Sequence, residues 1–292
     1  MMDDVIVNRQ TVLEIVLDGL HIPLEVYELR YSLFLRAANH HFSKGSDFGQ
    51  YIEPFPPCFY DSLTHTRLYD DLNTCSSTLP SLGFIQQITE ETSLPPQTWS
   101  LLCWIFTNPL NIQCFKQSEI SEYLTDELRE ETKLFSIPHP SDRCHRFQII
   151  HEDPNATRTF LTHKRAFGSF FAYHGSPGYN FHSIIHRGLR CSLNVRSAYG
   201  HGTYLTSYLQ TATEYALQYG YGVGVSRLHD RIRYCVAIVE VIKHPSVVVK
   251  NFSRHTMEDL ENKFDDTSSN EHRYYVVDSD ELMRLRHLLV FY

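Results

Sequence analysis

Long apolar runs and an excess of positive charge are the two features that this sequence of 292 residues lacks. A helix that crosses a bilayer needs roughly 18 or more consecutive apolar residues, and no stretch here reaches that length. Nucleic acids and anionic membranes select proteins with a basic face, whereas the net charge here is −8. The sequence therefore predicts no membrane span, no nucleic-acid partner and a cytoplasmic location.

The sequence also lacks the cysteine spacing of a disulfide framework or a zinc site. Its seven cysteines are scattered, and none forms a Cys-x-x-Cys pair, which favours reduced thiols. No Gly-x-Ser-x-Gly motif is present, so a triad-type hydrolase is not indicated. His182 and His186 have the four-residue spacing of a metal pair, but no third ligand accompanies them. We expect two exposed histidines on a helix and no metal.

The first part of the chain has the apolar spacing of helices. The expected helices lie around Tyr27–Ala38, after Pro95 and Pro96 up to Pro109, and from Ser118 to Leu128. The composition changes at residues 136–146, SIPHPSDRCHR, where two prolines and several polar residues interrupt the helical pattern. These features predict two domains, an α-helical domain at 1–140 and a second domain at 141–292.

The second domain has the apolar, β-branched and aromatic runs that are typical of strands. The expected strands are 147–151, 169–176, 202–206, 234–242, 246–250, 274–277 and 287–292. Two short helices are expected among them, at 180–189 and about 208–219. Runs of strands with few helices favour an α+β fold over alternating βαβ units.

Residues 173–219 concentrate groups that suit a small planar ligand. Gly175 follows His174 at the end of an expected strand, where a glycine allows a ligand to approach the backbone closely. Backbone N–H and C=O groups at such a place can together bind a carboxamide. Tyr204 and Tyr215 could stack on a flat heterocycle from opposite sides. Each tyrosine taken alone is better explained by packing, but the combination favours a pocket for a nicotinamide dinucleotide.

Three segments carry a family resemblance. His174-Gly175-Ser176, Gly202-Thr203-Tyr204-Leu205, and Tyr274–Val277 followed by LRHLLVFY resemble the catalytic domain of the poly(ADP-ribose) polymerase-like transferases. FHSIIHRGL at 181–189 and GTYLTSYL at 202–209 are similar to the mono-ADP-ribosylating branch of this family. That branch includes a tail-anchored protein of the endoplasmic reticulum. The likeness extends into the helical part. It implies a split-sheet transferase domain that uses NAD as substrate, and a place at the cytosolic face of that organelle.

The resemblance also implies roles for individual residues. His174, Tyr204 and Tyr274 form the three-part catalytic motif, in which His174 bonds the adenosine ribose. Gly175 binds the nicotinamide carboxamide through its backbone, and Tyr204 and Tyr215 enclose the ring. Ser176, Asn180 and Arg190 contact the adenosine side, and residues 191–201 form the loop over the dinucleotide.

Two positions depart from patterns in the family. Tyr274 stands where the polymer-forming members carry a glutamate, and Ala212 stands where many family members carry a serine that bonds the carboxamide. A phenol, with an ordinary pKa of about 10, is neutral at pH 7 and only exchanges hydrogen bonds. The resemblance therefore implies transfer of a single ADP-ribose to a protein side chain, including the enzyme's own. Two alternatives stay open: an inactive module that binds NAD or ADP-ribose, and a free NAD glycohydrolase.

Overall fold

The described chain forms two compact units. The computed structural model describes residues 2–18, 23–44, 52–115, 144–150, 153–194, 200–217, 232–253, 256–259 and 272–292. One unit extends to Leu110 and includes Gly178–His186, and the second holds the remaining described residues from Asn111 onward. The expected boundary at 140 and 141, and the expected helix from Ser118 to Leu128, lie outside the described residues and stay predictions.

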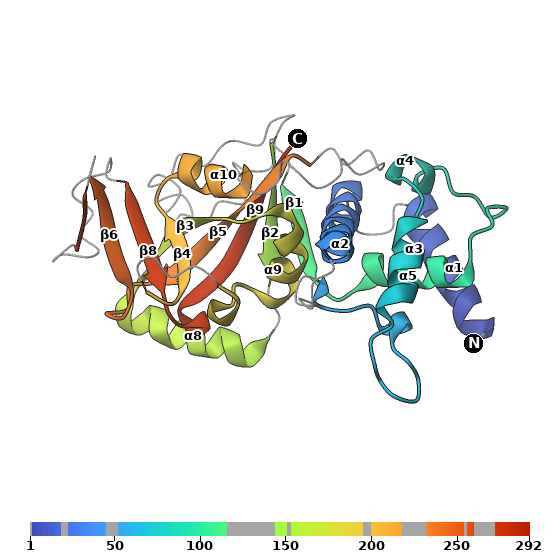
Figure 1. Ribbon diagram of the computed structural model, residues 1–292, viewed down its shortest axis with the longest axis horizontal. Helices are drawn as coiled ribbons and strands as arrows, with labels where there is room; N and C mark the ends of the chain where they lie inside the picture. Colours follow the sequence, from blue (N-terminus) through green and yellow to red (C-terminus); the bar gives the residue numbers. More distant parts are fainter. Residues whose placement is uncertain are drawn as a thin grey trace. The chain divides into compact units, whose positions relative to one another are not determined.

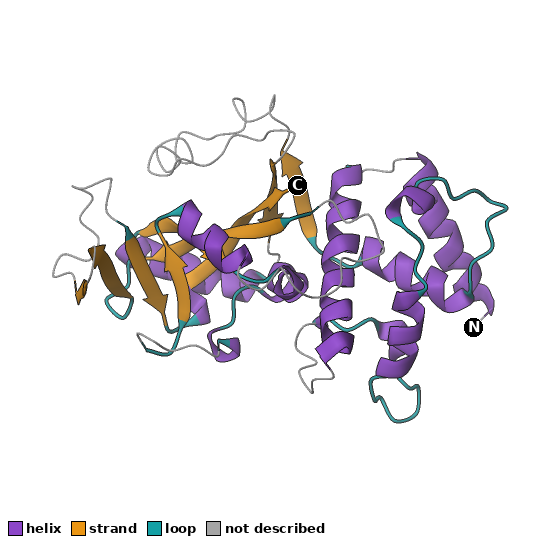
Figure 2. Cartoon of the chain, turned by 45° about the horizontal axis from the view of Figure 1, so that its top comes forward, coloured by secondary structure: helices purple, strands orange, loops and turns teal. Residues whose placement is uncertain are grey.

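The first unit is helical, as Figure 2 shows in purple. Its helices are α1 (Met2–Asp18), α2 (Leu24–Lys44), η2 (Pro57–Phe59), α3 (Tyr69–Ser77), α4 (Leu82–Ile85), α5 (Pro96–Thr107), η3 (Gly178–Asn180) and most of α9 (Phe181–Arg187). The predicted helix after Pro95 is confirmed as α5, with Pro96 in its first turn, where a missing N–H costs nothing.

A buried arginine fixes the end of α5 to α2. Arg30 of α2 donates hydrogen bonds to the carbonyl oxygens of Phe106, at 2.5 Å, of Asn108, at 3.1 Å, and of Leu110. The last carbonyls of a helix lack partners within the helix. The Arg30 guanidinium is such a partner for Phe106 in α5, and it also bonds the segment just after the helix. Tyr27 packs its ring edge-on against Phe106 beside this contact, with centroids 5.3 Å apart. The two helices are therefore joined by both apolar and polar contacts.

The second unit is built on one nine-stranded antiparallel sheet, which confirms the α+β prediction. Its strands are β1 (Asn111–Phe115), β2 (Cys144–Ile150), β3 (Ser169–Gly175), β4 (Thr203–Thr206), β5 (Tyr234–Ile242), β6 (Val248–Ser253), β7 (Thr256–Asp259), β8 (Arg273–Val277) and β9 (Met283–Phe291). Their spatial order is β1-β2-β9-β5-β3-β4-β8-β6-β7. The β-branched run of β5 lies near the centre, where such side chains pack well.

The sheet is divided near its middle, at the junction of β3 and β4. Seven residue pairs join β3 to β5, and four join β4 to β8. Between β3 and β4 the described ladder consists of one pair, Tyr173 with Thr206. His174 and Gly175 follow that pair on β3, and Tyr204 lies two residues before Thr206 on β4. The split therefore lies where the predicted motif residues meet.

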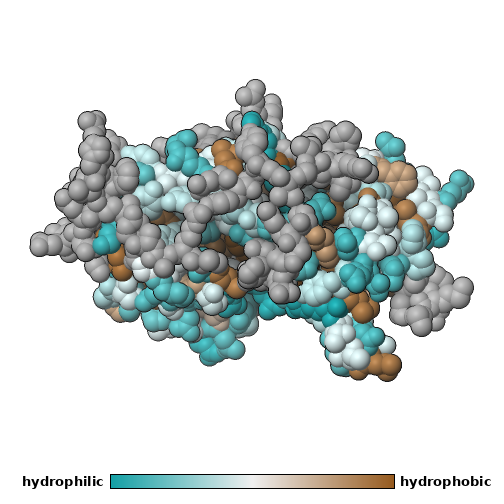
Figure 3. Space-filling model, viewed as in Figure 1, coloured by the Kyte–Doolittle hydropathy of each residue, from teal (hydrophilic) through white to brown (hydrophobic). Residues whose placement is uncertain are grey.

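Two helices flank the strands of this unit. In Figure 1, α10 (Leu209–Leu217) lies above the strands and α8 (Pro154–Phe167) below them. The carboxylate of Glu240 on β5, which is 1% exposed, holds α8 through an ion pair with Lys164 at 2.7 Å. It also pairs with Arg286 of β9 at 2.5 Å. The outward surface of α8 is mostly hydrophilic (Figure 3).

Candidate functional site

The side chain of His174 bridges the divided junction. Its Nδ1–H donates to the carbonyl oxygen of Tyr204 at 2.9 Å, because a carbonyl can only accept. Burial lowers the pKa of His174, while the bond to Tyr204 opposes that shift. The ring is therefore neutral at pH 7, and Nε2 carries a lone pair. A neutral Nε2 can accept a hydrogen bond from a ribose hydroxyl, the role that the resemblance implies.

Gly175 lies against the backbone of α10. A Cβ built on Gly175 would meet the carbonyl oxygen of Ala212 at 1.8 Å and its carbonyl carbon at 2.6 Å. Real Cβ contacts essentially never fall below 3.0 Å, so any side chain here requires the helix to move. Gly175 is thus needed for the packing of β3 on α10. The backbone role that the resemblance implies stays a prediction.

Tyr204 and Tyr274 share one face of the sheet. Tyr274 on β8 lies opposite Thr206 of β4, and Tyr204 lies two residues from Thr206. Opposed residues and residues two apart project on the same side, so the two phenols are diagonal neighbours. The Tyr204 hydroxyl donates to the carbonyl oxygen of Gly200 at 2.8 Å. The register therefore brings together the second and third parts of the motif, which are far apart in sequence.

The other predicted site residues have different settings. Ser176 is buried and follows β3, whereas Asn180 lies in η3 of the first unit. Tyr215 is 43% exposed on α10, so part of this residue is accessible to a ligand. The enclosure of a ring by Tyr204 and Tyr215, and the adenosine contacts of Ser176 and Asn180, stay predictions.

The expectation of two exposed histidines on α9 is wrong, because His186 is half-buried and His182 is fully buried. This side chain is 3% exposed and its Nε2–H donates to the carbonyl oxygen of Pro54 at 3.2 Å. Its ring packs edge-on against Phe34, with centroids 5.5 Å apart. Burial, assisted by the neighbouring His186, lowers the pKa of His182 to about 3. His182 is a packed core residue because α2 and the Pro54 segment cover it.

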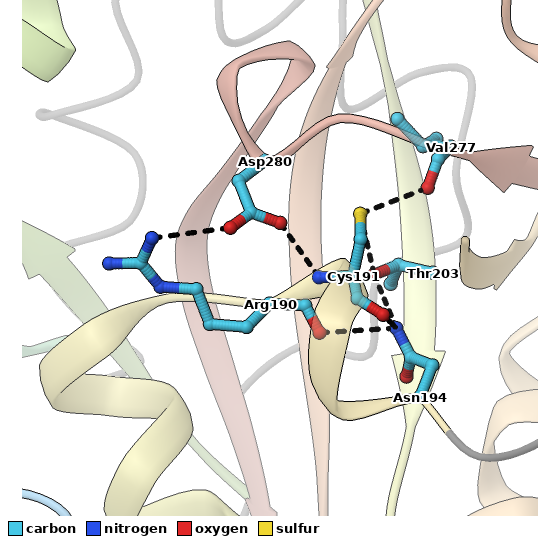
Figure 4. Close-up of polar contacts among 6 residues, drawn as sticks. All are labelled: Arg190, Cys191, Asn194, Thr203, Val277 and Asp280. Atoms are coloured by element: carbon cyan, nitrogen blue, oxygen red, sulfur yellow. Dashed lines mark hydrogen bonds and ion pairs between the residues drawn. The ribbon is translucent and has the colours of Figure 1, made fainter. Parts of the chain in front are cut away.

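Arg190 and the start of the predicted donor loop are held by Asp280 (Figure 4). Asp280 Oδ1 accepts from the backbone N–H of Cys191 at 2.7 Å, and Oδ2 pairs with Arg190 Nη1 at 3.2 Å. The buried Cys191 thiol donates to the carbonyl oxygen of Val277 at 3.2 Å. Asn194 donates to the Thr203 hydroxyl at 2.9 Å. The contacts fasten η4 (Cys191–Leu193) to β4 and to the segment after β8.

Replacing Asp280 by alanine is expected to raise the KM for NAD about three- to tenfold with a smaller change in kcat. The lost bonds involve a charged acceptor, but Arg190 and Asp280 are partly exposed, which limits their strength. Steady-state kinetics over a range of NAD concentrations measure the effect. Asp278→Ala is the matched control, because this exposed aspartate bonds Ser246 and not η4. Equal KM values for both variants would contradict the anchoring role of Asp280.

Sequence reasoning missed two residues that the fold brings to this region. Asp280 meets Cys191 across 89 residues, and His272 contacts Thr211 across 61. The signal for His272 was its position two residues before Tyr274, because side chains two residues apart in an extended segment project to the same side. No local sequence pattern marks Asp280, because only the path of the chain after β8 brings it to its partners.

The donor set fits NAD better than a metal or a hydrolytic triad. Within the described residues, His, Cys, Asp and Glu form no group of three that could hold a metal ion. If the roles implied by the resemblance hold, His174 offers Nε2 to a ribose hydroxyl, Tyr204 and Tyr215 offer aromatic surfaces to the nicotinamide ring, and Arg190 contacts the adenosine side. The helices of the described part include none that is both long enough and apolar enough to cross a bilayer.

Comparisons with known proteins identify the family. Residues 125–226 match the family model described as poly(ADP-ribose) polymerase catalytic domain. The mouse (Mus musculus) protein mono-ADP-ribosyltransferase PARP16 is 32% identical over 245 residues, which cover 82% of this chain and 72% of that protein. Its human (Homo sapiens) counterpart is 32% identical over 246 residues, with the same coverage. Mouse protein mono-ADP-ribosyltransferase PARP8 is 39% identical over 67 residues, 21% of this chain and 8% of that protein.

The likeness to the first two relatives extends well beyond the motif segments and takes in both the helical and the sheet-bearing parts of the chain. The prediction of an NAD-using transferase is thereby confirmed at the level of the family. The chain belongs to the poly(ADP-ribose) polymerase family of NAD-dependent ADP-ribosyltransferases.

Proposed function

We propose that this protein transfers a single ADP-ribose from NAD to a side chain of a protein acceptor, itself included. The observation that carries the proposal is the Tyr274 phenol, which shares the sheet face of Tyr204 at the third motif position. A phenol there hydrogen-bonds but supplies no negative charge. Relatives that are 32% identical are named mono-ADP-ribosyltransferases, which supports the same activity here.

The reaction breaks the bond between nicotinamide and C1′ of the attached ribose. Nicotinamide leaves as a neutral molecule with the bonding electron pair, and the ribose acquires positive charge in the transition state. A lone pair of the acceptor side chain forms the new bond to C1′, and an acceptor that carries a proton releases it. Neither partner is oxidised or reduced.

The residues of the site would accelerate this step by positioning. The His174 Nε2 atom accepts from a hydroxyl of the adenosine ribose, and the Gly175 backbone holds the carboxamide. Tyr204 keeps its ring direction through the hydroxyl bond to Gly200. Holding the reacting atoms in register can account for several kcal/mol of a barrier, ~7–11 in favourable cases. An acceptor carboxylate would add the charge that Tyr274 lacks.

Incubation of the purified chain with NAD labelled in its adenylate part tests the proposal. We expect covalent label on the protein, nicotinamide released in equal amount, and intact masses that correspond to one ADP-ribose per modified side chain. A ladder of masses at one site would indicate polymer formation. Nicotinamide release without label would indicate a glycohydrolase. No release, with a melting temperature raised by NAD, would indicate a binding module.

Two further assignments belong to this proposal. We expect the acceptors to be proteins and not nucleic acids, because the chain carries a net charge of −8. The motif segments resemble a branch that includes a tail-anchored protein of the endoplasmic reticulum, and on this resemblance we propose the cytosolic side of that organelle as the place of action. Fractionation of cells that express a tagged chain tests this location.

A further inference from the structure

The ring of His272 contacts two tyrosine rings, those of Tyr208 and Tyr274. The His272 ring lies 4.8 Å from that of Tyr208, centroid to centroid, with an interplanar angle of 36°. It lies 5.0 Å from that of Tyr274, with an angle of 28°. Both distances are within the range of favourable aromatic pairs, about 4.5–7 Å. His272 thus joins the residue before α10 to the third residue of the motif.

A hydrogen bond fixes the His272 ring in this place. Its Nε2 atom lies 2.9 Å from the hydroxyl oxygen of Thr211, and Thr211 is buried on α10. Burial lowers the pKa of His272, although the carboxylate of Glu214 opposes the shift. At pH 7 the ring is therefore neutral, and Nε2 accepts from the threonine hydroxyl when Nδ1 carries the proton. With one edge bonded, the ring has little freedom to turn.

Helix α10, to which His272 is hydrogen-bonded, also carries other parts of the proposed site. Thr211 and Tyr215 are four residues apart on α10 and share a helix face. Ala212, next to Thr211, presents the carbonyl that Gly175 packs against. His272 therefore ties β8 to the same helix that approaches Gly175 and bears Tyr215.

We infer that His272 is a positioning residue, which orients the Tyr274 phenol for the transfer step by stacking on its ring. The inference rests on the proposed function, since it concerns how Tyr274 acts there. Tyr274 occupies the position where polymer-forming members carry a glutamate. A phenol has one hydroxyl, so the direction of the ring decides whether that hydroxyl reaches its partner. Displacing a group by about 1 Å can slow a reaction on the order of a hundredfold.

Two substitutions separate the ring contact with Tyr274 from the hydrogen bond to Thr211. His272→Ala removes both the stack and the bond to Thr211, whereas His272→Phe keeps an aromatic ring against Tyr274 and loses only the bond. We expect His272→Ala to lower kcat for protein labelling about ten- to a hundredfold, with the KM for NAD within about twofold of the parent value. We expect His272→Phe to restore kcat to within about threefold.

His145→Ala is the matched control. This histidine lies on β2 and, like His272, contacts a tyrosine ring, that of Tyr292 at 4.9 Å, and a hydroxyl, that of Tyr292 at 3.3 Å from Nδ1. It belongs to no part of the proposed site, so its loss should leave both constants unchanged. Equal loss of kcat in His272→Ala and His272→Phe, or a change only in KM, would overturn the positioning role.

A readout without turnover separates this inference from the proposed function. The ring signals of Tyr274 in a nuclear magnetic resonance spectrum of tyrosine-labelled protein are assigned by their loss in Tyr274→Phe. They should shift and broaden in His272→Ala and stay near the parent positions in His272→Phe. Unchanged signals in His272→Ala overturn the inference even if labelling is observed. Shifted signals in a protein that never labels itself or another acceptor overturn the proposed function instead.

Discussion

Replacing His174 by alanine is expected to abolish transfer of ADP-ribose, with a loss of at least about a hundredfold in kcat/KM. The substitution removes Nε2, the acceptor that we propose for the ribose hydroxyl. It also removes the Nδ1–H bond to the Tyr204 carbonyl, which supports a junction whose described ladder has a single residue pair. Labelling of the protein by NAD, measured over time, gives the rate.

His174→Asn distinguishes the two contributions of this residue. An asparagine amide can place an N–H close to the position of Nδ1, and so keep the bond to Tyr204, but it offers nothing at the position of Nε2. We expect His174→Asn to melt near the parent temperature and still to be inactive. Transfer by His174→Asn at the parent rate would show that His174 serves the junction and not the substrate.

Gly175→Ala is expected to have the largest effect on both stability and activity. The new methyl group would lie 1.8 Å from the Ala212 carbonyl oxygen, and backbone cannot give way as a flexible side chain can. Forcing extra atoms into a packed site costs about 1–3 kcal/mol, and occasionally more. We expect a melting temperature lower by about 5 °C or more. Transfer should be lost because α10 carries Tyr215, which we propose to stack on the nicotinamide ring.

Gly83→Ala is the control for this substitution. Gly83 lies in α4, and a Cβ built there meets no heavy atom within 4 Å. Alanine also favours the helix by about 1 kcal/mol, so this variant should be as stable as the parent protein or more so. Thermal melting followed by a labelling assay compares the two variants. Parent-like stability of Gly175→Ala would mean that β3 and α10 do not approach as closely as described.

Strong local sequence patterns predicted much of the fold. The apolar run at 234–242 forms β5 over the predicted residues, and Pro95 with Pro96 marks the start of α5. Helix α8 went unpredicted because most of its residues are polar, and Phe160 is its one buried residue. Its ends did carry signals: Asp153 accepts from two backbone N–H groups at the start, and Gly168 has a φ of 74° after the end.

The site was predictable only where short segments identify it. The His174-Gly175 pair, Tyr204 and Tyr274 stand in recognisable motifs, but the motifs do not give the register that opposes Tyr274 to Thr206. The burial of His182 depends on a contact with Pro54, 128 residues away. Such contacts arise from tertiary packing, and neither propensity nor periodicity encodes them.

The setting of Cys191 has a consequence for inhibitor chemistry. Cys191 directly follows Arg190, so an electrophile carried by an NAD-like compound would be expected to reach it. The thiol is buried, however, and its sulfur bonds the Val277 carbonyl. Burial raises its pKa and the Thr203 hydroxyl only partly opposes that shift, and alkylation requires the thiolate. Reversible compounds that compete for the aromatic surfaces of Tyr204 and Tyr215 therefore suit this enzyme better than covalent ones.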